Sequence, residues 1–534
     1  MTTMASITHQ IPVDCITGSK IGLEKEGLRV SRNGVLSDTS HPYALGSALT
    51  HPSITTDFSE ALLELITPPT LCAENALHYL TETETFVHQN LADEMVWSAS
   101  MPCIVENADQ IPIANYGHSD SGMSKQVYRR GLAHRYGKMM QVIAGIHFNH
   151  SFSDDLWPVL QKLSGDNGEI QSFIADGYMH TLRNVQRYDW LLLYLFGASP
   201  ATDRSFAGAG ERLERFDKET YYAPYATSLR MGDMGYTNRL QTGRQMNIDC
   251  NSLDGYLSTM QGILKKSHPA YEEIGVIIDG IHQQLNTHLL QIENEFYTSV
   301  RPKQIPLSGE SPLEALQQRG IRYLELRSID VNPFTPTGVE IAQLHFLEVF
   351  THFSLISESP YIDHSSTDIN RHNLNQTAYF GRSSGLKLNN NGKEVSLREW
   401  GNQIFDQMQP VAELLDKAHN TNQYLNALKH YQRYLSEPEL TPSAKLLSGM
   451  REQRESFSGF IQQQSASHHD HYLSRSLSQA RFEYYEALTR QSFRQQRHLE
   501  CQSEGLYGDH ESKITNDRPY FGCEPCVCAS SQFL

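Results

Sequence analysis

Polar and apolar residues alternate along several short segments of the chain, and a period of about two residues is typical of β-strands. The pattern predicts strands over Gly22–Ser31, Val142–Phe152, Leu289–Tyr297 and Ile321–Asp330. Consecutive parallel strands would need a regular β-α-β rhythm, which this sequence does not show. We therefore expect an α+β fold, in which helices surround one large antiparallel or mixed sheet.

The second half of the chain has a helical pattern instead. Apolar spacing and scarce Gly and Pro predict helices over Trp400–Lys417, Asn422–Leu435 and Gln479–Leu499. Before them, Ser357–Lys393 is rich in Ser, Asn, Gly and Asp, which is the composition of loops. These patterns predict one integrated structural unit with four parts: a sheet-containing core that carries the chemistry (1–350), a loop-rich connection (351–399), a helical part packed on the core (400–500) and a tail (501–534).

The chain is acidic, and its net charge disfavours binding to other negatively charged partners. Its 534 residues include 44 Lys and Arg against 61 Asp and Glu, a net charge of −17. Such a field repels nucleic acid and anionic membranes, so phosphate groups would need local Arg, Lys or bound metal. The longest apolar run, Trp190–Ala198, is too short to span a bilayer, and Met1–Cys15 lacks a signal-peptide pattern. Eight mostly isolated cysteines suit a reducing compartment, so we expect a cytoplasmic protein with small-molecule partners and no obligatory protein partner.

Acidic residues recur inside the predicted strands. Glu24 and Glu26 share one strand face, as do Glu325 and Arg327, because side chains two apart point to the same side. Burying unpaired carboxylates costs more than a domain's whole stability, so a positive partner is expected, with a divalent metal as the leading candidate. Taken singly, Glu24 and Glu26 fit a solvated edge strand equally well, and Glu325 with Arg327 fits a structural ion pair.

The segment Thr55–Pro68 adds Asp57, Glu60 and Glu64 among apolar neighbours. Helical spacing would align all three acids on one face, whereas a strand would align only Glu60 with Glu64. The sequence leaves both possibilities open, and either gives another acidic face.

His147 and Asn149 share one face of a predicted strand. A lone histidine there is usually a hydrogen-bonded core residue, yet imidazole is also a competent metal ligand beside carboxylates. A ligand set rich in oxygen and free of cysteine indicates a hard cation such as Mg²⁺ or Mn²⁺. Because Mg²⁺ usually completes its shell with water and substrate phosphate, this cation predicts a nucleotide.

Common phosphate-binding and nucleophile motifs are missing from the sequence, since nothing matches a Walker sequence or a Gly-x-Ser-x-Gly turn. Phosphate would therefore be held by metal and arginine. Basic and aromatic residues cluster at Tyr128–Arg130, Tyr225–Arg230, Gly235–Asn238 and Glu295–Lys303. Each cluster alone fits an ordinary surface Arg or half-buried Tyr, but together with the acidic face they suit an amino-acid substrate.

Two further clusters carry no predicted function. Cys523, Cys526 and Cys528 have the spacing of half a zinc site without a second pair nearby, which predicts an exposed tail. His468–His471 lies in Gln- and Ser-rich helical surroundings and predicts a solvated surface.

Several longer motifs follow one another between residues 15 and 335. They are Gly22–Val30, Gly46–Glu64, Gly145–Asn149, Phe196–Pro200, Tyr225–Arg230, Leu290–Glu295 and Glu325–Phe334. In this order they closely resemble glutamate–cysteine ligases of the proteobacterial type. The resemblance implies a glutamine-synthetase-like fold, in which a curved, mainly antiparallel sheet forms a funnel surrounded by helices, with a helical C-terminal part.

The resemblance also implies roles for the site residues. Glu26, Asp57 and Glu64 would hold one Mg²⁺, while Glu24, His147 and Glu325 would hold a second. A third ion would lie between Glu24, Glu325 and the nucleotide phosphates, and Arg327 would contact the phosphate being transferred. The cysteine and glutamate pockets would be lined by Tyr128, Arg129, Arg230, Tyr236 and Tyr297, with Asn149 nearby. The role of Glu60 stays open.

The activity that the resemblance implies is the ATP-dependent ligation of L-glutamate to L-cysteine, the first step of glutathione biosynthesis. ATP would phosphorylate the side-chain carboxylate of glutamate, and the cysteine amine would displace phosphate to give γ-glutamylcysteine and ADP. Three alternatives remain: a related ligase with another acceptor amine, a metal-dependent hydrolase, and a non-catalytic sensor of small molecules.

Overall fold

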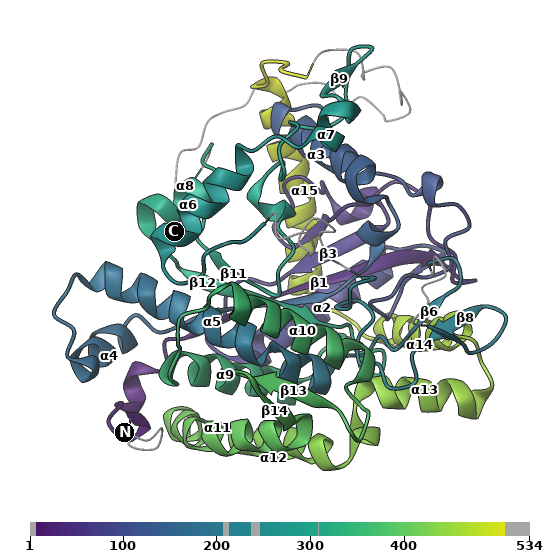
Figure 1. Cartoon of the computed structure of the whole chain (residues 1–534). Helices are drawn as coiled ribbons and strands as arrows, with labels where there is room; N and C mark the ends of the chain where they lie inside the picture. Colours follow the sequence, from purple (N-terminus) through teal and green to yellow (C-terminus); the bar gives the residue numbers. More distant parts are fainter. Residues whose placement is uncertain (1–6, 207–212, 236–245, 308, 508–534) are drawn as a thin grey trace.

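The centre of the molecule is a seven-stranded sheet in which every paired strand runs antiparallel to its neighbour (Figure 1). The computed structural model describes residues 7–206, 213–235, 246–307 and 309–507. The strand order is β11-β12-β5-β1-β3-β2, with β4 paired to the far end of β1. These strands are β1 (Lys20–Ser31), β2 (Ile54–Thr56), β3 (Leu62–Ile66), β4 (Glu94–Val96), β5 (Ile146–Ser151), β11 (Val300–Lys303) and β12 (Tyr323–Ile329).

Alternation along β1 sends its side chains into two different environments. Ile21 and Leu23 join the larger hydrophobic cluster, whereas Leu28 and Val30 belong to a second cluster on the other side of the strand. The acids Glu24 and Glu26 have the same strand parity as Leu28 and Val30. They therefore lie on the sheet face that is turned away from the larger cluster.

Helices cover the face of the sheet that carries the larger cluster. In Figure 1 the long helix α5 (Ile170–Phe196) lies against the sheet, α9 (Ile341–Ile356) lies below it, and α11 (Leu397–His419) and α12 (Gln423–Ser436) form the lowest layer. Helix α2 (Ala73–Gln89) packs on β1 and β3. Among the described helices none is long and apolar enough to cross a bilayer.

The remaining elements surround this frame. The helices are α3 (Asp120–Tyr136), α4 (Leu156–Ser164), α6 (Leu253–Leu264), α7 (Pro269–Ile274), α8 (Pro312–Arg319), α10 (His364–Phe380), α13 (Pro442–Gln453), α14 (Phe457–Ser474) and α15 (Gln479–Cys501). Three small sheets are formed by β6 (Ala201–Asp203), β7 (Glu214–Arg215) and β8 (Thr220–Tyr222), by β9 (Ile277–Ile278) and β10 (Ile281–His282), and by β13 (Lys387–Asn390) and β14 (Lys393–Ser396).

The expected fold class is confirmed, because an antiparallel sheet is surrounded by helices and the C-terminal part is helical. The predicted strands at Val142–Phe152 and Ile321–Asp330 contain β5 and β12, and the one at Gly22–Ser31 coincides with β1 except that β1 begins at Lys20. The three predicted helices in the second half are α11, α12 and α15, and their observed ends differ from the predicted ones by at most three residues.

The predicted strand at Leu289–Tyr297 is wrong, because the segment contains a 3-10 turn at Glu293–Glu295 instead. Tertiary contacts override its apparent alternation. The carboxylate of Glu295 is fully buried and accepts a hydrogen bond from Arg135 at 2.9 Å and another from the Tyr136 hydroxyl at 2.8 Å. These contacts fasten the segment to α3.

The loop composition of Ser357–Lys393 was also misleading, because most of it forms α10 and the hairpin β13–β14. Asp363 caps α10 by accepting a hydrogen bond from the backbone amide of Ser366. The polar residues of the hairpin do serve as a turn, since Asn391 and Gly392 both have positive φ, as a tight two-residue turn requires.

The predicted solvated surface at His468–His471 is wrong for its first two histidines. Because α14 packs against α2 and β4, His468 and His469 are buried, and only Asp470 and His471 are exposed. His469 is hydrogen-bonded to His88 through their Nδ1 atoms at 2.8 Å. The cysteines predicted to form an exposed tail, Cys523, Cys526 and Cys528, lie outside the described residues.

Candidate functional site

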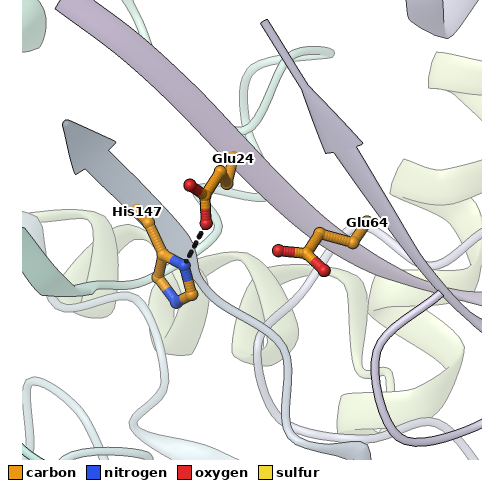
Figure 2. A group of neighbouring side chains, drawn as sticks. All are labelled: Glu24, Glu64 and His147. Atoms are coloured by element: carbon orange, nitrogen blue, oxygen red, sulfur yellow. Dashed lines mark hydrogen bonds and ion pairs between the residues drawn. The ribbon is translucent and has the colours of Figure 1, made fainter. Parts of the chain in front are cut away.

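Three central strands bring predicted ligands together on the sheet face opposite the larger hydrophobic cluster. Pairing of β1 with β5 sets Glu24 opposite His147, and pairing of β1 with β3 sets Glu26 opposite Glu64. One ligand atom each from Glu24, Glu64 and His147 lie within 4.8 Å of one another, and Figure 2 shows all three side chains converging. The strand register therefore builds a compact acidic cluster.

The fourth strand adds Glu325, which stands opposite Asn149 in the pairing of β12 with β5. Both predicted residues on the β5 face bind the same acid: His147 Nδ1 donates to Glu24 Oε2 at 3.0 Å, and the Asn149 amide donates to Glu24 Oε1 at 2.8 Å. Glu325 Oε1 lies 3.8 Å from His147 Nδ1. His147 is thus shared between two carboxylates, and Asn149 orients one of them.

Asp57 and Glu26 complete the acidic face. Asp57 directly follows β2, and Glu64 lies on β3, so this segment is a strand hairpin and the alternative of a helix is excluded. Glu26 is buried, with one carboxylate oxygen 3.7 Å from His147 Nε2. Asp57 is half-buried, and its carboxylate lies 3.7 Å from Arg129 on α3.

Glu60, whose role the sequence left open, lies in the turn between β2 and β3. Its buried carboxylate accepts hydrogen bonds from the backbone amides of His41 at 2.7 Å and Asn115 at 3.0 Å. Glu60 therefore ties two loops to the hairpin, and these contacts give it a structural role.

The pKa values of these acids are shifted in different directions because their charged neighbours differ. Burial raises the pKa of Glu64 well above its ordinary value, and the neighbouring charges of Glu24 and Asp57 raise it further. Burial likewise raises the pKa of Glu26. For Glu24, burial also favours the neutral acid, but the hydrogen bond from His147 and the charges of His147 and Lys303 together outweigh it, and the pKa is lowered. The acids around Glu64 thus carry more negative charge than their protein partners can neutralise.

Cations gather instead at the other end of the face, around Glu325. Arg327 Nη1 lies 3.2 Å from one oxygen of its carboxylate, and Lys303 Nζ lies 3.3 Å from the other. Burial opposes ionisation of Glu325, but Lys303 and Arg327 hold its pKa well below the ordinary value. Arg327 is also 3.4 Å from His147, so it connects the cationic end to the cluster in Figure 2.

A cavity of about 440 Å³ opens beside Arg327, within the usual size range of small-molecule pockets. Arg230 and Tyr297 line it, as the resemblance implies, and residues of α10 form another wall. Arg230 donates to the backbone carbonyl of Arg327 at 2.7 Å, and Tyr297 is hydrogen-bonded to Gln141 at 3.2 Å. Both side chains are buried and held in place before any ligand binds.

Arg129 and Tyr128 lie together on α3, outside the residues that line this cavity. The Arg129 guanidinium stacks 4.6 Å above the ring of Tyr116 and donates to the backbone carbonyl of Asp57 at 2.6 Å. Tyr128 is partly buried against the second hydrophobic cluster. Arg129 therefore belongs to the acidic face, whereas Tyr128 packs behind it. The predicted residue Tyr236 lies outside the described residues.

Two residues of this site had no role of their own in the sequence analysis, where Lys303 appeared only as a member of the basic and aromatic cluster Glu295–Lys303. Lys303 follows Arg301 by two positions on β11, so a strand assignment for this segment would have placed both on one face. Gly145 belongs to a recognised motif, and the structure explains its identity: a Cβ there would lie 2.1 Å from the Arg230 guanidinium.

The donor set fits a hard divalent cation. Glu24, Glu64 and His147 offer two carboxylates and one imidazole, and the other acids on the face add only oxygen donors. Among the described cysteines, which are Cys15, Cys72, Cys103, Cys250 and Cys501, none belongs to this group. Soft metals would find no thiolate here, whereas Mg²⁺ or Mn²⁺ would find the ligands that they prefer.

Known proteins are similar to this chain in sequence and in fold. Residues 4–377 match the glutamate–cysteine ligase family. A glutamate–cysteine ligase from Alcanivorax borkumensis is 45% identical over 90% of this chain and 92% of its own length. Another from Pseudomonas putida is 43% identical over 88% of this chain and 90% of its own length.

Two solved structures have folds similar to that of this chain. A glutamate–cysteine ligase from Francisella tularensis in complex with AMP superposes with a TM-score of 0.86 at 34% identity, over 92% of this chain and 96% of that one. A bifunctional glutathione synthetase from Pasteurella multocida, at 24% identity and a TM-score of 0.72, shares the fold over 91% of this chain and 58% of that one.

Proposed function

The chain belongs to the glutamate–cysteine ligase family, and from this premise we propose that it joins the side-chain carboxylate of L-glutamate to the amine of L-cysteine. ATP drives the reaction, whose products are γ-glutamylcysteine, ADP and phosphate. This is the first step of glutathione biosynthesis. The observation that carries the proposal is the convergence of Glu24, Glu64 and His147 on one sheet face, beside the cationic group around Glu325.

Charge balance supports a divalent cation at this face. Burial and neighbouring acids raise the pKa of Glu64, so ionisation of its carboxylate is unfavourable unless a positive charge lies beside it. We assign Glu26, Asp57 and Glu64 to one Mg²⁺ or Mn²⁺, and Glu24, His147 and Glu325 to a second. A third would lie between Glu24, Glu325 and the nucleotide phosphates. When bound, such ions neutralise negative charge on the phosphate groups.

Arg327 is the catalytic residue of the proposal. In the first step an oxygen of the glutamate side chain attacks the γ-phosphorus of ATP, ADP leaves, and γ-glutamyl phosphate forms. Charge spreads over the transferred phosphoryl group, and a guanidinium placed beside it stabilises that charge. Arg327 suits this task because its guanidinium lies between Glu325 and His147 and also lines the cavity.

The cavity beside Arg327 is the proposed amino-acid pocket. Arg230 lies 3.6 Å from Asp330 and is held by the Arg327 carbonyl, so its guanidinium is fixed where it can bind a substrate carboxylate. Tyr297 offers a phenol on the same wall, and Asn149 acts through Glu24. By family resemblance we also assign Arg129, Tyr128 and Tyr236 to substrate binding; Arg129 and Tyr128 would act from α3, outside the lining of this cavity.

In the second step the cysteine amine attacks the acyl carbon of γ-glutamyl phosphate. The new C–N bond forms as the C–O bond to phosphate breaks, and the amine loses a proton. The acyl phosphate is itself the activated species, so the reaction needs no covalent bond between substrate and enzyme.

The test is a reconstituted reaction of the purified protein with glutamate, cysteine, ATP and Mg²⁺. We expect γ-glutamylcysteine by mass spectrometry, with one ADP and one phosphate released per product. Hydroxylamine in place of cysteine should trap γ-glutamyl phosphate as the hydroxamate. Cysteine that reacts no faster than 2-aminobutyrate or ammonia would identify a ligase with another acceptor, and turnover without ATP would identify a hydrolase.

A further inference from the structure

Three cations surround Glu325, but they are held in different ways. Arg301 donates to the backbone carbonyls of Asn294 and Phe296, so its guanidinium is fixed by the chain. Arg327 lies between Glu325 and His147 and lines the cavity. Lys303 has a single ion pair among the described residues, the one with Glu325 at 3.3 Å.

Lys303 is also the most accessible of the three. Its side chain is 21% exposed, against 7% for Arg301 and 12% for Arg327, whereas the carboxylate that it faces is only 3% exposed. A lysine ammonium is a compact charge on a flexible four-carbon stem, so it can change partners with little cost in the surrounding packing. Lys303 is therefore the cation of this group that can move.

We propose that Lys303 is a nucleotide-phosphate-binding residue that exchanges partners during substrate binding. In the structure its ammonium lies 3.3 Å from Glu325 and neutralises that carboxylate. When a divalent cation takes that carboxylate, the ammonium turns to the phosphate oxygens of ATP. The proposal rests on the proposed function and adds a residue, and an order of events, to the same site.

Electrostatics gives the reason for the exchange. A carboxylate oxygen that binds a divalent cation attracts an ammonium less, because the two positive charges repel each other at a separation of a few ångströms. A polyphosphate brought to the same place offers several anionic oxygens, and lysine binds phosphate as a point charge. Lys303 thus competes with the cation before ATP arrives and assists ATP afterwards.

Because of this dual role, we expect the substitution Lys303→Met to change the affinities for Mn²⁺ and for ATP in opposite directions. In Lys303→Met the affinity for Mn²⁺ without nucleotide should increase several-fold, because the competing ammonium is gone. The affinity for ATP in the presence of saturating Mn²⁺ should decrease about tenfold, because one charge-assisted contact is lost. A residue that merely supports the fold would not shift the two affinities in opposite directions.

The experiment measures Mn²⁺ binding to the full chain by electron paramagnetic resonance of free Mn²⁺, and ATP binding by calorimetry without amino acids. Lys303→Arg, which keeps the charge, should retain most of the ATP affinity. The matched control is Lys387→Met, because Lys387 forms an exposed pair with Glu394 at 3.5 Å in the separate hairpin β13–β14, and it should change neither affinity. Circular dichroism and melting temperature verify that each variant is folded.

Two outcomes would overturn the proposal: wild-type ATP affinity in Lys303→Met, or Mn²⁺ affinity that falls together with ATP affinity. Failure of the proposed function is recognised separately. A wild-type protein that forms no γ-glutamylcysteine would refute the ligase assignment, whereas an active wild type with an unaffected Lys303→Met variant would refute only the role of Lys303.

Discussion

The buried ion pair between Lys25 and Glu84, on the face of β1 opposite the acids, allows a quantitative test of how charged residues of β1 are stabilised. Lys25 stands between Glu24 and Glu26 in sequence, yet its side chain points to the opposite face and its ammonium pairs with Glu84 of α2. The two side chains are 6% and 0% exposed. His88, one helical turn further along α2, approaches the other oxygen of Glu84 at 3.4 Å.

The perturbation is Glu84→Gln, which removes the negative charge and leaves the Lys25 ammonium buried without its counter-ion. Burial favours the neutral acid, but the charge of Lys25 and the hydrogen bond from His88 hold the pKa of Glu84 at about 2, below its ordinary value of 4.5. That difference corresponds to about 3 kcal/mol of native-state stabilisation. Breaking a buried pair by removing one partner typically costs about 3–5 kcal/mol, so we expect a loss of this size.

The double variant Lys25→Met/Glu84→Gln should recover much of the loss, because neither charge is then buried alone. The assay is urea unfolding followed by circular dichroism at pH 7. Glu437→Gln is the control, since its pair with Arg433 is about half exposed on both sides and should be worth less than about 1 kcal/mol. A loss below about 1 kcal/mol in Glu84→Gln, or a double variant that is less stable than either single variant, would refute the reasoning.

The same pair predicts a dependence on pH. The folded-state pKa of Glu84 lies below its unfolded-state value, so its stabilisation is complete above about pH 4.5 and is lost as the pH falls toward about 2. The stability difference between wild type and Glu84→Gln should therefore be constant between pH 7 and pH 5 and should shrink below pH 4.5.

Three further predictions concern the site and the core. Asn149→Ala removes the amide that donates to Glu24 at 2.8 Å, so the Mg²⁺ concentration for half-maximal activity should rise several-fold; an unchanged activation curve would contradict the orienting role. Gly145→Ala places a Cβ against the Arg230 guanidinium, so the KM for an amino acid should rise while the ATP affinity stays unchanged, which steady-state kinetics would check. Burial lowers the folded-state pKa of His352 to about 4, so its neutral form contributes stability that is complete above about pH 6.5 and is lost as the pH falls toward 4. His352→Gln should therefore reduce the decline of the urea midpoint between pH 7 and pH 5, and an identical decline would refute it.

Alternation was sufficient to predict β1, β5 and β12 because those strands separate an apolar face from a polar one. It failed at Leu289–Tyr297 because the polar residue there, Glu295, is buried by a partner on α3 that is 160 residues away. It failed again over Ser357–Lys393, where α10 is a mostly polar helix with few buried residues. The spacing of apolar residues indicates which positions are buried. It therefore cannot predict an element whose polar groups are buried in pairs, or a helix whose surface is mostly polar and exposed.

Part of the site could be predicted from the alternation of side chains along a strand. The shared face of Glu24 and Glu26, and that of His147 and Asn149, follow from strand parity alone. The meeting of Glu24 with Glu64 and His147 depends on the pairing of three strands, which parity does not specify. Family resemblance supplied the grouping of residues, but the contact of Lys303 with Glu325 became visible only when β11 and β12 were paired.

The way in which buried charges are balanced distinguishes the site from the rest of the core. In the core, Lys25 meets Glu84 and Arg135 meets Glu295, so each of these buried cations has a dedicated acid. On the acidic face this matching is lost: cations gather around Glu325, whereas burial and the acids around Glu64 raise its pKa. A folded protein has no structural reason to separate its charges in this way, because each unmatched group costs stability. The separation is explained if ligands complete the face, with divalent cations held by the acids of β1 and β3 together with His147 and Glu325, and phosphate beside Arg327 and Lys303.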